Sequence, residues 1–180
     1  MRVLGLIVEY NPFHNGHLYH IKKSVELINP DYTVAVMSGN FVQRGEPAIV
    51  DKFARTQMAL SYGADVVFEL PFVYCVQDAG GFACGSVGVL HRTGAVTDIV
   101  FGSESSDIGI LNEISGILSS QPQEYTIILK KYLKEGLSFP NARKYAILDY
   151  LSSQSYPIEN IQLLEKSNDI LGLEYLNYLK

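Results

Sequence analysis

The feature that most constrains the fold of this chain is a series of short, continuously apolar runs in its N-terminal half. The runs are VLGLIV (3–8), TVAVMSG (33–39), DVVFELP (65–71) and DIVFGSE (98–104). A strand that is apolar on both faces is typical of a parallel sheet covered by helices on both sides. We therefore expect these runs to form the strands of such a sheet.

Helical patterns separate the apolar runs. Leu18, Ile21 and Ile28 recur at the spacing of one helix face and predict a helix over 16–28, and residues 51–62 offer a second helical segment. A third helical segment covers 78–91. Alternating strands and helices of these lengths predict an α/β fold with a Rossmann-like, doubly wound parallel sheet and right-handed crossovers.

The pattern changes from about residue 107 onward. The segments DIGILNEISGILSS, YTIILKKYLKEG, NARKYAILDYL and IENIQLLEKSNDILGLEYLNYLK all read as helices joined by polar turns. We therefore expect an α/β core over residues 1–106, followed by a helical part over residues 107–180 that packs on it.

Composition excludes several classes of function. The 180 residues carry a formal net charge of -5, which does not favour a domain that wraps nucleic acid by charge alone. Cys75 and Cys84 show no zinc spacing and no secretory context, so reduced thiols are the favoured interpretation. The apolar start MRVLGLIVEY is too short for a signal peptide or a membrane span. We expect a cytoplasmic protein without membrane attachment.

Polar residues gather where the predicted strands end. Glu9 to His17 follow the first strand, Ser38 to Glu46 follow the second, and Gly102 to Glu104 end the fourth. In open parallel sheets, ligands bind beyond the carboxyl ends of the strands, near the point where the strand order reverses. The sequence thus predicts a ligand site at this edge.

The segment EYNPFHNGHLYHI contains three histidines, for which a metal, a packed core and a phosphate are the alternatives. His14 and His17 stand where the first strand turns into a helix, and the free amides of a helix start suit an anion. Gly16 is expected to let the backbone approach a ligand closely. Zinc is less favoured, because no Cys or carboxylate cluster completes a tetrahedral set. His20 is interpreted as a packed or surface residue of the helix.

The spacing His-x-Gly-His in HNGH (14–17) resembles the signature of the HIGH-type nucleotidyltransferase superfamily. The strings GLIVEYNPFHNGHLYHI, MSGNFVQRGEPAIVDKFAR, GADVVFELPF and FGSE, with LSFPNARKYA and SNDILGLEYLNYL, resemble one family within it, the tRNA(Met) cytidine acetate ligases. The resemblance implies ATP-dependent activation of acetate to acetyl-adenylate. The acetyl group then passes to N4 of the wobble cytidine of elongator tRNA(Met).

The resemblance also implies which residues form the site. His14 and His17 would be the catalytic residues that hold the phosphates, and Mg²⁺ would come with ATP, held by phosphates and water rather than by a protein metal site. Asp169 stands where the family often has a second asparagine, so either Asn168 or Asp169 would be the contact. The implied nucleotide contacts are Ile7, Val8, Glu9, Tyr10, Asn11, Pro12, Phe13, His14, Asn15, Gly16, His17, Leu18, Tyr19, His20, Gly102 and Asn168.

A second set of polar residues is expected to contact substrate or tRNA. Either the loop after the second strand is an ordinary connector, or its side chains form the wall of the substrate pocket. The basic residues are either solvated helix faces or contacts for phosphate and tRNA. The pocket residues would be Ser38, Asn40, Gln43 and Arg44, and the basic contacts Lys52, Arg55 and Arg143.

Two other functions stay open at this point. One is another HIGH-type adenylyltransferase acting on a small phosphorylated metabolite, and the other is a nucleotide- or tRNA-binding module without turnover. The family's chains continue beyond the point where this chain stops at Lys180. We therefore expect this chain to be truncated relative to the family, and its oligomeric state is not predicted.

Overall fold

The computed structural model of the chain describes residues 1–156 and 164–180. These residues form two compact units, Met1–Gly102 and Ser103–Lys180. The division lies slightly earlier than the predicted one, because residues 103–106 belong with the helical unit. The packing of the helical part on the core stays a prediction.

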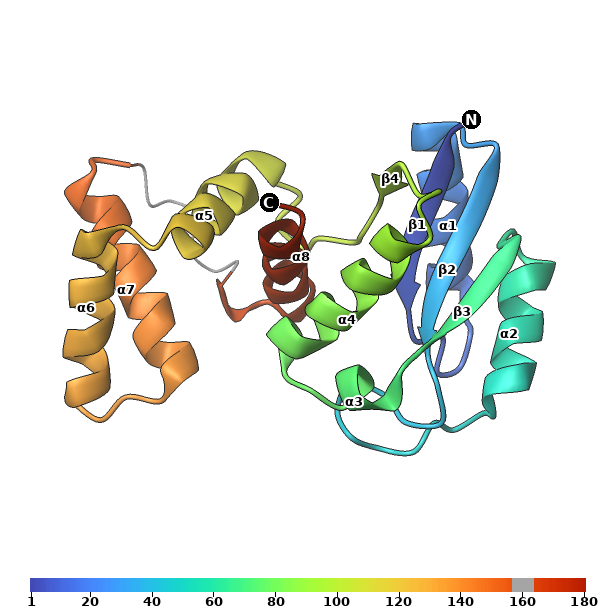
Figure 1. The fold of residues 1–180 in the computed structure, drawn as a ribbon, viewed down its shortest axis with the longest axis horizontal. Coiled ribbons are helices and arrows are strands. Elements are labelled where there is room, and N and C mark those ends of the chain that lie inside the picture. Colours follow the sequence, from blue (N-terminus) through green and yellow to red (C-terminus); the bar gives the residue numbers. More distant parts are fainter. Residues whose placement is uncertain (157–163) are drawn as a thin grey trace. The chain divides into compact units, whose positions relative to one another are not determined.

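The first unit contains a parallel four-stranded sheet (Figure 1). The strand order is β3-β2-β1-β4, so the chain moves outward from β1 to β3 and then returns to the other side of β1. The order therefore reverses between β1 and β4. The strands are β1 (Val3–Val8), β2 (Tyr32–Ser38), β3 (Val66–Leu70) and β4 (Asp98–Ile99).

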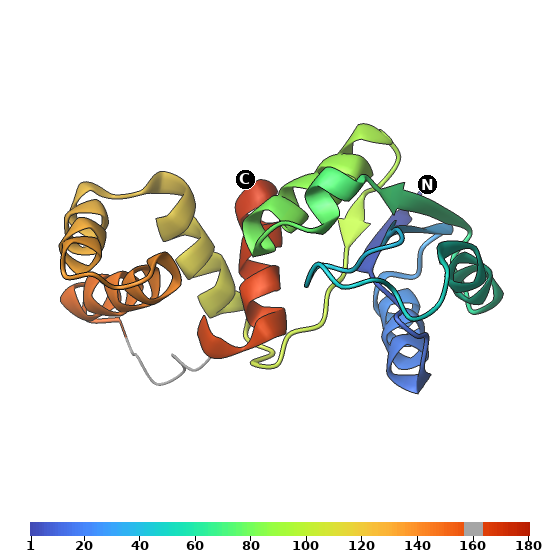
Figure 2. The ribbon, with the colours of Figure 1, turned by 90° about the horizontal axis from the view of Figure 1, so that it is seen from below.

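Helices cover both faces of this sheet. Figure 2 shows α1 (Asn15–Ile28) and α2 (Lys52–Ser61) on one face and α4 (Ala79–Arg92) on the other. This arrangement confirms the predicted doubly wound α/β fold. It also explains the continuous apolar runs, because Val3 and Leu4, which are neighbours on β1 and point to opposite faces, are both buried.

Two strands differ from the prediction. The fourth pairs through only two residues, Leu4 with Asp98 and Gly5 with Ile99, and the chain then leaves the sheet instead of continuing to 104. The third lies at the edge, where Val66 and Phe68 stay exposed. A short helix, α3 (Phe72–Cys75), follows β3. It was not predicted, because its four residues are too few to show a helical periodicity.

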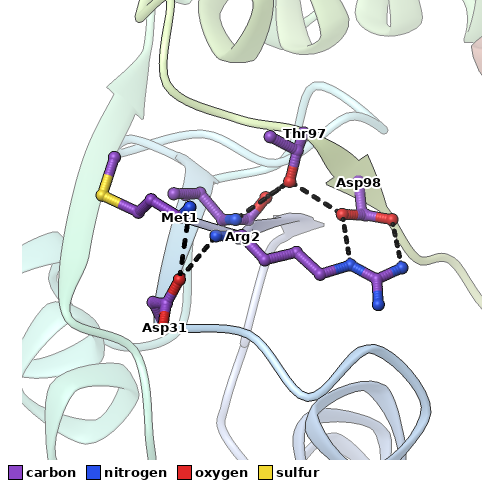
Figure 3. Close-up of polar contacts among 6 residues, drawn as sticks. Met1, Arg2, Asp31, Thr97 and Asp98 are labelled. Carbon is purple, nitrogen blue, oxygen red and sulfur yellow. Dashed lines mark hydrogen bonds and ion pairs between the residues drawn. The ribbon is translucent and has the colours of Figure 1, made fainter.

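Polar contacts fasten β4 at its amino end (Figure 3). The Arg2 guanidinium donates to both carboxylate oxygens of Asp98, at 3.1 and 3.0 Å. The Thr97 hydroxyl accepts from the Val3 amide at 2.9 Å and donates to Asp98 at 2.7 Å. The Arg2 amide donates to the Asp31 carboxylate at 2.6 Å. An ion pair and hydrogen bonds therefore hold the amino ends of β1 and β4 together, at the end of the sheet opposite the carboxyl ends where a ligand is predicted.

The second unit consists of helices. Helix α6 packs against α7 and α5 packs against α8. The predicted helical segment beginning at residue 158 lies outside the described residues until residue 164. No helix within the described ranges is long and apolar enough to cross a membrane. The helices are α5 (Ile108–Ser120), α6 (Gln123–Lys134), α7 (Phe139–Ser153) and α8 (Ser167–Tyr178).

Candidate functional site

The predicted ligand residues of the first unit meet at the carboxyl edge of its sheet. Glu9 follows β1, Asn40 lies just beyond β2, and Gly102 lies just beyond β4. Strands β1 and β4 are neighbours, so Glu9 and Gly102 lie on the two sides of the reversal in strand order. This is the position at which open α/β sheets bind ligands.

The side chains of two histidines cap the amino end of α1. His14 is the N-cap, and its Nδ1 accepts from the Gly16 amide at 3.0 Å. Nδ1 of His17 accepts from the His14 amide at 3.3 Å. The two bonds form a capping box. Here the imidazoles accept the hydrogen bonds that Ser and Glu side chains accept in the usual capping box. The two rings are stacked with 3.7 Å between centroids.

His17 lies against an aromatic wall. Its ring centroid is 4.9 Å from that of Tyr10 and 5.7 Å from that of Phe13. Burial, with a smaller contribution from His14 and His20, lowers the pKa of His17 to about 4. Burial also lowers the pKa of His20. The imidazole of His17 is therefore neutral at ordinary pH.

The structure explains the glycine at position 16 by a contact within the protein, whereas the prediction explained it by the close approach of a ligand. A Cβ at this position would lie 2.9 Å from Cε1 and 3.0 Å from Nδ1 of His14. Glycine is therefore needed for the His14 ring to reach the Gly16 amide, whether or not a ligand comes close.

The loop after β2 forms a tight turn that brings its polar residues to β1. The Gly45 amide donates to the Val42 carbonyl at 2.8 Å, and Gly45 has a φ of +78°. The Gln43 amide donates to the Glu9 carboxylate at 2.7 Å. Burial raises the pKa of Glu9, and the positive charges of Arg55 and exposed Arg44 partly oppose this rise.

Arg55 is completely buried and binds backbone oxygens only. Its Nε donates to the Val50 carbonyl at 2.9 Å, and its Nη1 donates to the carbonyls of Glu9 at 2.7 Å and Ser38 at 3.1 Å. Its Nη2 donates to the Gly39 carbonyl. The predicted contact with phosphate or tRNA is corrected here, because no part of Arg55 reaches the surface. The side chain instead ties together the ends of β1 and β2.

Other residues of the second predicted set are also engaged within the protein. Ser38 is 1% exposed and cannot form the wall of an open pocket. The Lys52 ammonium donates to both carboxylate oxygens of Glu69, at 2.9 and 2.7 Å, so its charge is paired. Asn40 and Arg44 are exposed, and the contact of their side chains with substrate stays a prediction.

The predicted nucleotide stretch divides into core and surface. Val8 and Tyr10 belong to the hydrophobic core, so only their backbones could meet a ligand. Asn11 accepts from the Ile49 amide at 2.7 Å and thus holds the neighbouring loop. Gly102 has open space within 4 Å of where a Cβ would be. The exposed members of the stretch are Pro12, His14, Asn15, Gly16 and Tyr19, and Ile7, Glu9, Asn11, Phe13, His17, Leu18 and His20 are half-buried.

In the second unit, the structure separates Asn168 from Asp169. Asp169 is completely buried and accepts from the Ser103 hydroxyl and from the amides of Glu104 and Ser105. Glu104 in return accepts from the amides of Asn168 at 3.3 Å and Asp169 at 3.1 Å. The carboxylate of Asp169 is thus occupied by these hydrogen bonds. Of the two residues, Asn168 is the one that is exposed.

Arg143 is likewise engaged within its own unit. Its Nη2 lies 2.5 Å from Oε1 of Glu174, whose side chain is only 6% exposed. The predicted contact of Arg143 with tRNA is therefore not supported by its geometry. Glu174 was missed as its partner, although a lone carboxylate in the apolar stretch ILGLEYL is a detectable signal, because such a charge needs a partner.

No group of three or more His, Cys, Asp or Glu residues in the described ranges could hold a metal ion.

Comparisons place these features among known proteins. The chain matches the family described as HIGH Nucleotidyl Transferase over residues 1–180. It is 63% identical over 179 residues to a tRNA(Met) cytidine acetate ligase of Fervidobacterium nodosum, covering 99% of this chain and 41% of that protein. A tRNA(Met) cytidine acetate ligase of Kosmotoga olearia is 61% identical, with 100% of this chain and 42% of that protein covered. The chain therefore spans less than half the length of these relatives.

Solved structures agree with this similarity. The crystal structure of Thermotoga maritima TmcAL bound with alpha-thio ATP has a TM-score of 0.97 and 61% identity to this chain, covering 99% of this chain and 43% of that one. The apo form of the same protein also has a TM-score of 0.97 and covers 42% of its own chain.

Proposed function

The chain belongs to the HIGH nucleotidyltransferase family, and from this membership we propose that it binds ATP and activates acetate as part of a tRNA(Met) cytidine acetate ligase. The observation that carries the proposal is the 61% identity and TM-score of 0.97 to a protein crystallised with alpha-thio ATP. The likeness covers 99% of this chain, so it extends over both units.

The geometry at the carboxyl edge supports a nucleotide there. His14 and His17 stand at the first turn of α1, where the donors of their rings suit phosphate oxygens. Gly102 has a negative φ and no close neighbour, so nothing in its own unit requires glycine. We propose that a ligand requires it instead. The proposed contacts from the second unit are limited to Asn168, because Asp169 is already bonded.

The proposed reaction has two steps. An acetate oxygen attacks the α-phosphate of ATP, the bond to the β-phosphate breaks, and acetyl-adenylate and pyrophosphate form. The N4 amine of the wobble cytidine of elongator tRNA(Met) then takes the acetyl group and AMP leaves. His14 and His17 would stabilise charge on the phosphates during the first step. Mg²⁺ would accompany the triphosphate, and the protein would act in the cytoplasm.

Exchange of labelled pyrophosphate into ATP tests the first step. The 180-residue chain is assayed with acetate, with propionate and without any acid. We expect exchange that depends on acetate and falls by about 10²-fold in His14→Ala or His17→Ala, in the range typical of a lost charge-stabilising donor. A matched control is His91→Gln, which changes an exposed histidine in the last turn of α4.

The other outcomes separate the alternatives. Exchange that is equally fast without acetate would contradict acetate activation and would favour an adenylyltransferase for another acceptor. ATP binding without any exchange would indicate a nucleotide-binding module. Acetylation is measured separately, by adding tRNA(Met) and following acetate label into the RNA.

A further inference from the structure

We infer that the capping box of α1 fixes His14 and His17 as neutral Nε2–H tautomers, so that each ring offers one uncharged hydrogen-bond donor to the phosphates. The first half of this inference rests on the contacts within α1. The second half rests on the proposed function, because it requires a nucleotide at this edge.

The hydrogen bonds of the box decide the tautomer. A neutral imidazole carries one proton, and the nitrogen that accepts a hydrogen bond is the one without it. Nδ1 of His14 accepts from the Gly16 amide, and Nδ1 of His17 accepts from the His14 amide. Both protons must therefore be on Nε2. The box uses neither Nε2, so both of these donors stay available to a ligand.

The surroundings also disfavour charge on the ring of His17. Protonation of Nδ1 would place a donor against the amide that it now accepts from, in either ring. The ring centroids are 3.7 Å apart, so two imidazolium ions would repel each other. The titratable groups that face His17 are His14, His20 and Tyr10, and none of them is an acid that would favour a charged imidazole.

Gly16 sets the box. Its missing side chain is what lets the His14 ring stand over the amide of residue 16, because a Cβ would come within 2.9 Å of Cε1. An alanine at this position must push the ring aside and break its bond. The glycine of the motif is thereby linked to the orientation of the first histidine.

Nuclear magnetic resonance of the chain labelled with ¹⁵N-histidine tests the tautomers directly. The two nitrogens of each ring are assigned by replacing the four histidines in turn, and His91 serves as the exposed reference. At about pH 7 we expect an unprotonated Nδ1 and a protonated Nε2 in both rings. Addition of ATP should shift the Nε2 signals of residues 14 and 17 and leave that of His91 unchanged.

The possible results separate the inference from the proposed function. A protonated Nδ1 in either ring at this pH overturns the inference, whether or not ATP binds. Calorimetric binding of ATP without movement of the Nε2 signals overturns the role as donors and leaves the proposed function standing. Absence of ATP binding, with Nε2–H tautomers observed, overturns the proposed function and the role as donors but not the tautomers.

Substitutions give a second readout. In Gly16→Ala the His14 ring should lose its fixed tautomer, and ATP affinity should fall roughly tenfold, the effect of about one hydrogen bond. Gly88→Ala is the matched control, since its Cβ would find its nearest neighbour, Arg92, at 3.8 Å. His14→Asn keeps an N-cap oxygen, so the melting temperature should hold while ATP affinity falls. Unchanged ATP affinity in both Gly16→Ala and His14→Asn would overturn the role of the rings as donors to the nucleotide.

Discussion

The two units of the chain each hold an arginine away from solvent, and they use it differently. Arg55 in the first unit binds four backbone carbonyls and is completely buried. Arg143 in the second unit binds one carboxylate, that of Glu174, and its side chain is 23% exposed. Carbonyl oxygens accept hydrogen bonds without cancelling the charge, whereas a carboxylate cancels it. In the first unit the guanidinium is held by carbonyls and is balanced through space by acidic groups such as Glu9 and Asp51, whereas in the second unit it is paired directly with a carboxylate.

Removing Arg55 should produce the largest effect. Arg55→Met leaves the carbonyls of Val50, Glu9, Ser38 and Gly39 without this donor, and we expect a loss of about 4 kcal/mol in the free energy of unfolding. Arg55→Lys should recover only part of it, because an ammonium group lacks the planar fork of five donors. Urea unfolding measures both. A loss below about 1 kcal/mol for Arg55→Met would contradict the role given to it.

Breaking the pair in the second unit should cost less and should be reversible by a second substitution. Arg143→Met leaves the carboxylate of Glu174 almost buried and unpaired, and we expect a loss of about 3 kcal/mol. Arg143→Met with Glu174→Met should restore most of this stability, since it removes both charges. No second side-chain substitution can do the same for Arg55, whose partners are backbone groups.

The same double variant tests the predicted tRNA contact of Arg143. We expect it to retain tRNA on a filter as well as the unchanged chain does. Loss of retention in a variant that remains folded would show that Arg143 binds RNA in addition to pairing with Glu174.

His17 gives a smaller, pH-dependent effect in the first unit alone. Its pKa is about 4 in the folded chain and about 6.5 in an unfolded one, so the unfolded state takes up its proton first as the pH falls. The stability from this group is fully present above about pH 6.5 and is lost as the pH falls toward 4.

Comparison with a variant isolates this contribution. His17→Gln should lose less stability than the unchanged chain over the same interval, because Gln does not titrate. Gln can still accept from the His14 amide, so the capping bond is kept. The comparison is needed because the raised pKa of Glu9 acts in the opposite direction. Equal slopes of unfolding free energy against pH would contradict the neutral, half-buried imidazole.

Gly102 should show the smallest change in stability. A Cβ there meets nothing within 4 Å, so Gly102→Ala should alter the free energy of unfolding by less than about 0.5 kcal/mol. If the ligand is what requires glycine, ATP affinity should nevertheless fall, as measured by calorimetry. Unchanged affinity would remove Gly102 from the proposed contacts.

Sequence patterns located the strands of the first unit well. The apolar runs placed β1 at its observed residues and β2 within one residue, because burial on both faces leaves a direct signal in composition. The length of β4 was overestimated. Its pairing ends after Ile99, where the chain turns away, and apolar composition does not record whether a partner strand is still adjacent.

The partners of polar side chains were less accessible to prediction. The acceptors of Arg55 are main-chain groups up to 46 positions away, and no side-chain pattern announces them. Arg143 read as a basic surface residue because its partner lies on another helix. The capping box of α1 was hidden for another reason. Imidazoles replace the usual Ser and Glu, so the expected spacing of a capping box is present without its usual residues.

The fastening of β4 has a consequence for the opposite edge. Its ion pair and hydroxyl bonds all lie at its amino end, around Arg2 and Asp98, and beyond Ile99 the Val100 amide reaches the Gly5 carbonyl at 3.3 Å. Arg2 lowers the pKa of Asp98, so strong acid or high salt would release this strand from the end remote from any ligand. Fraying that starts there would extend along the chain toward Gly102, the nucleotide contact proposed at the other end of this strand.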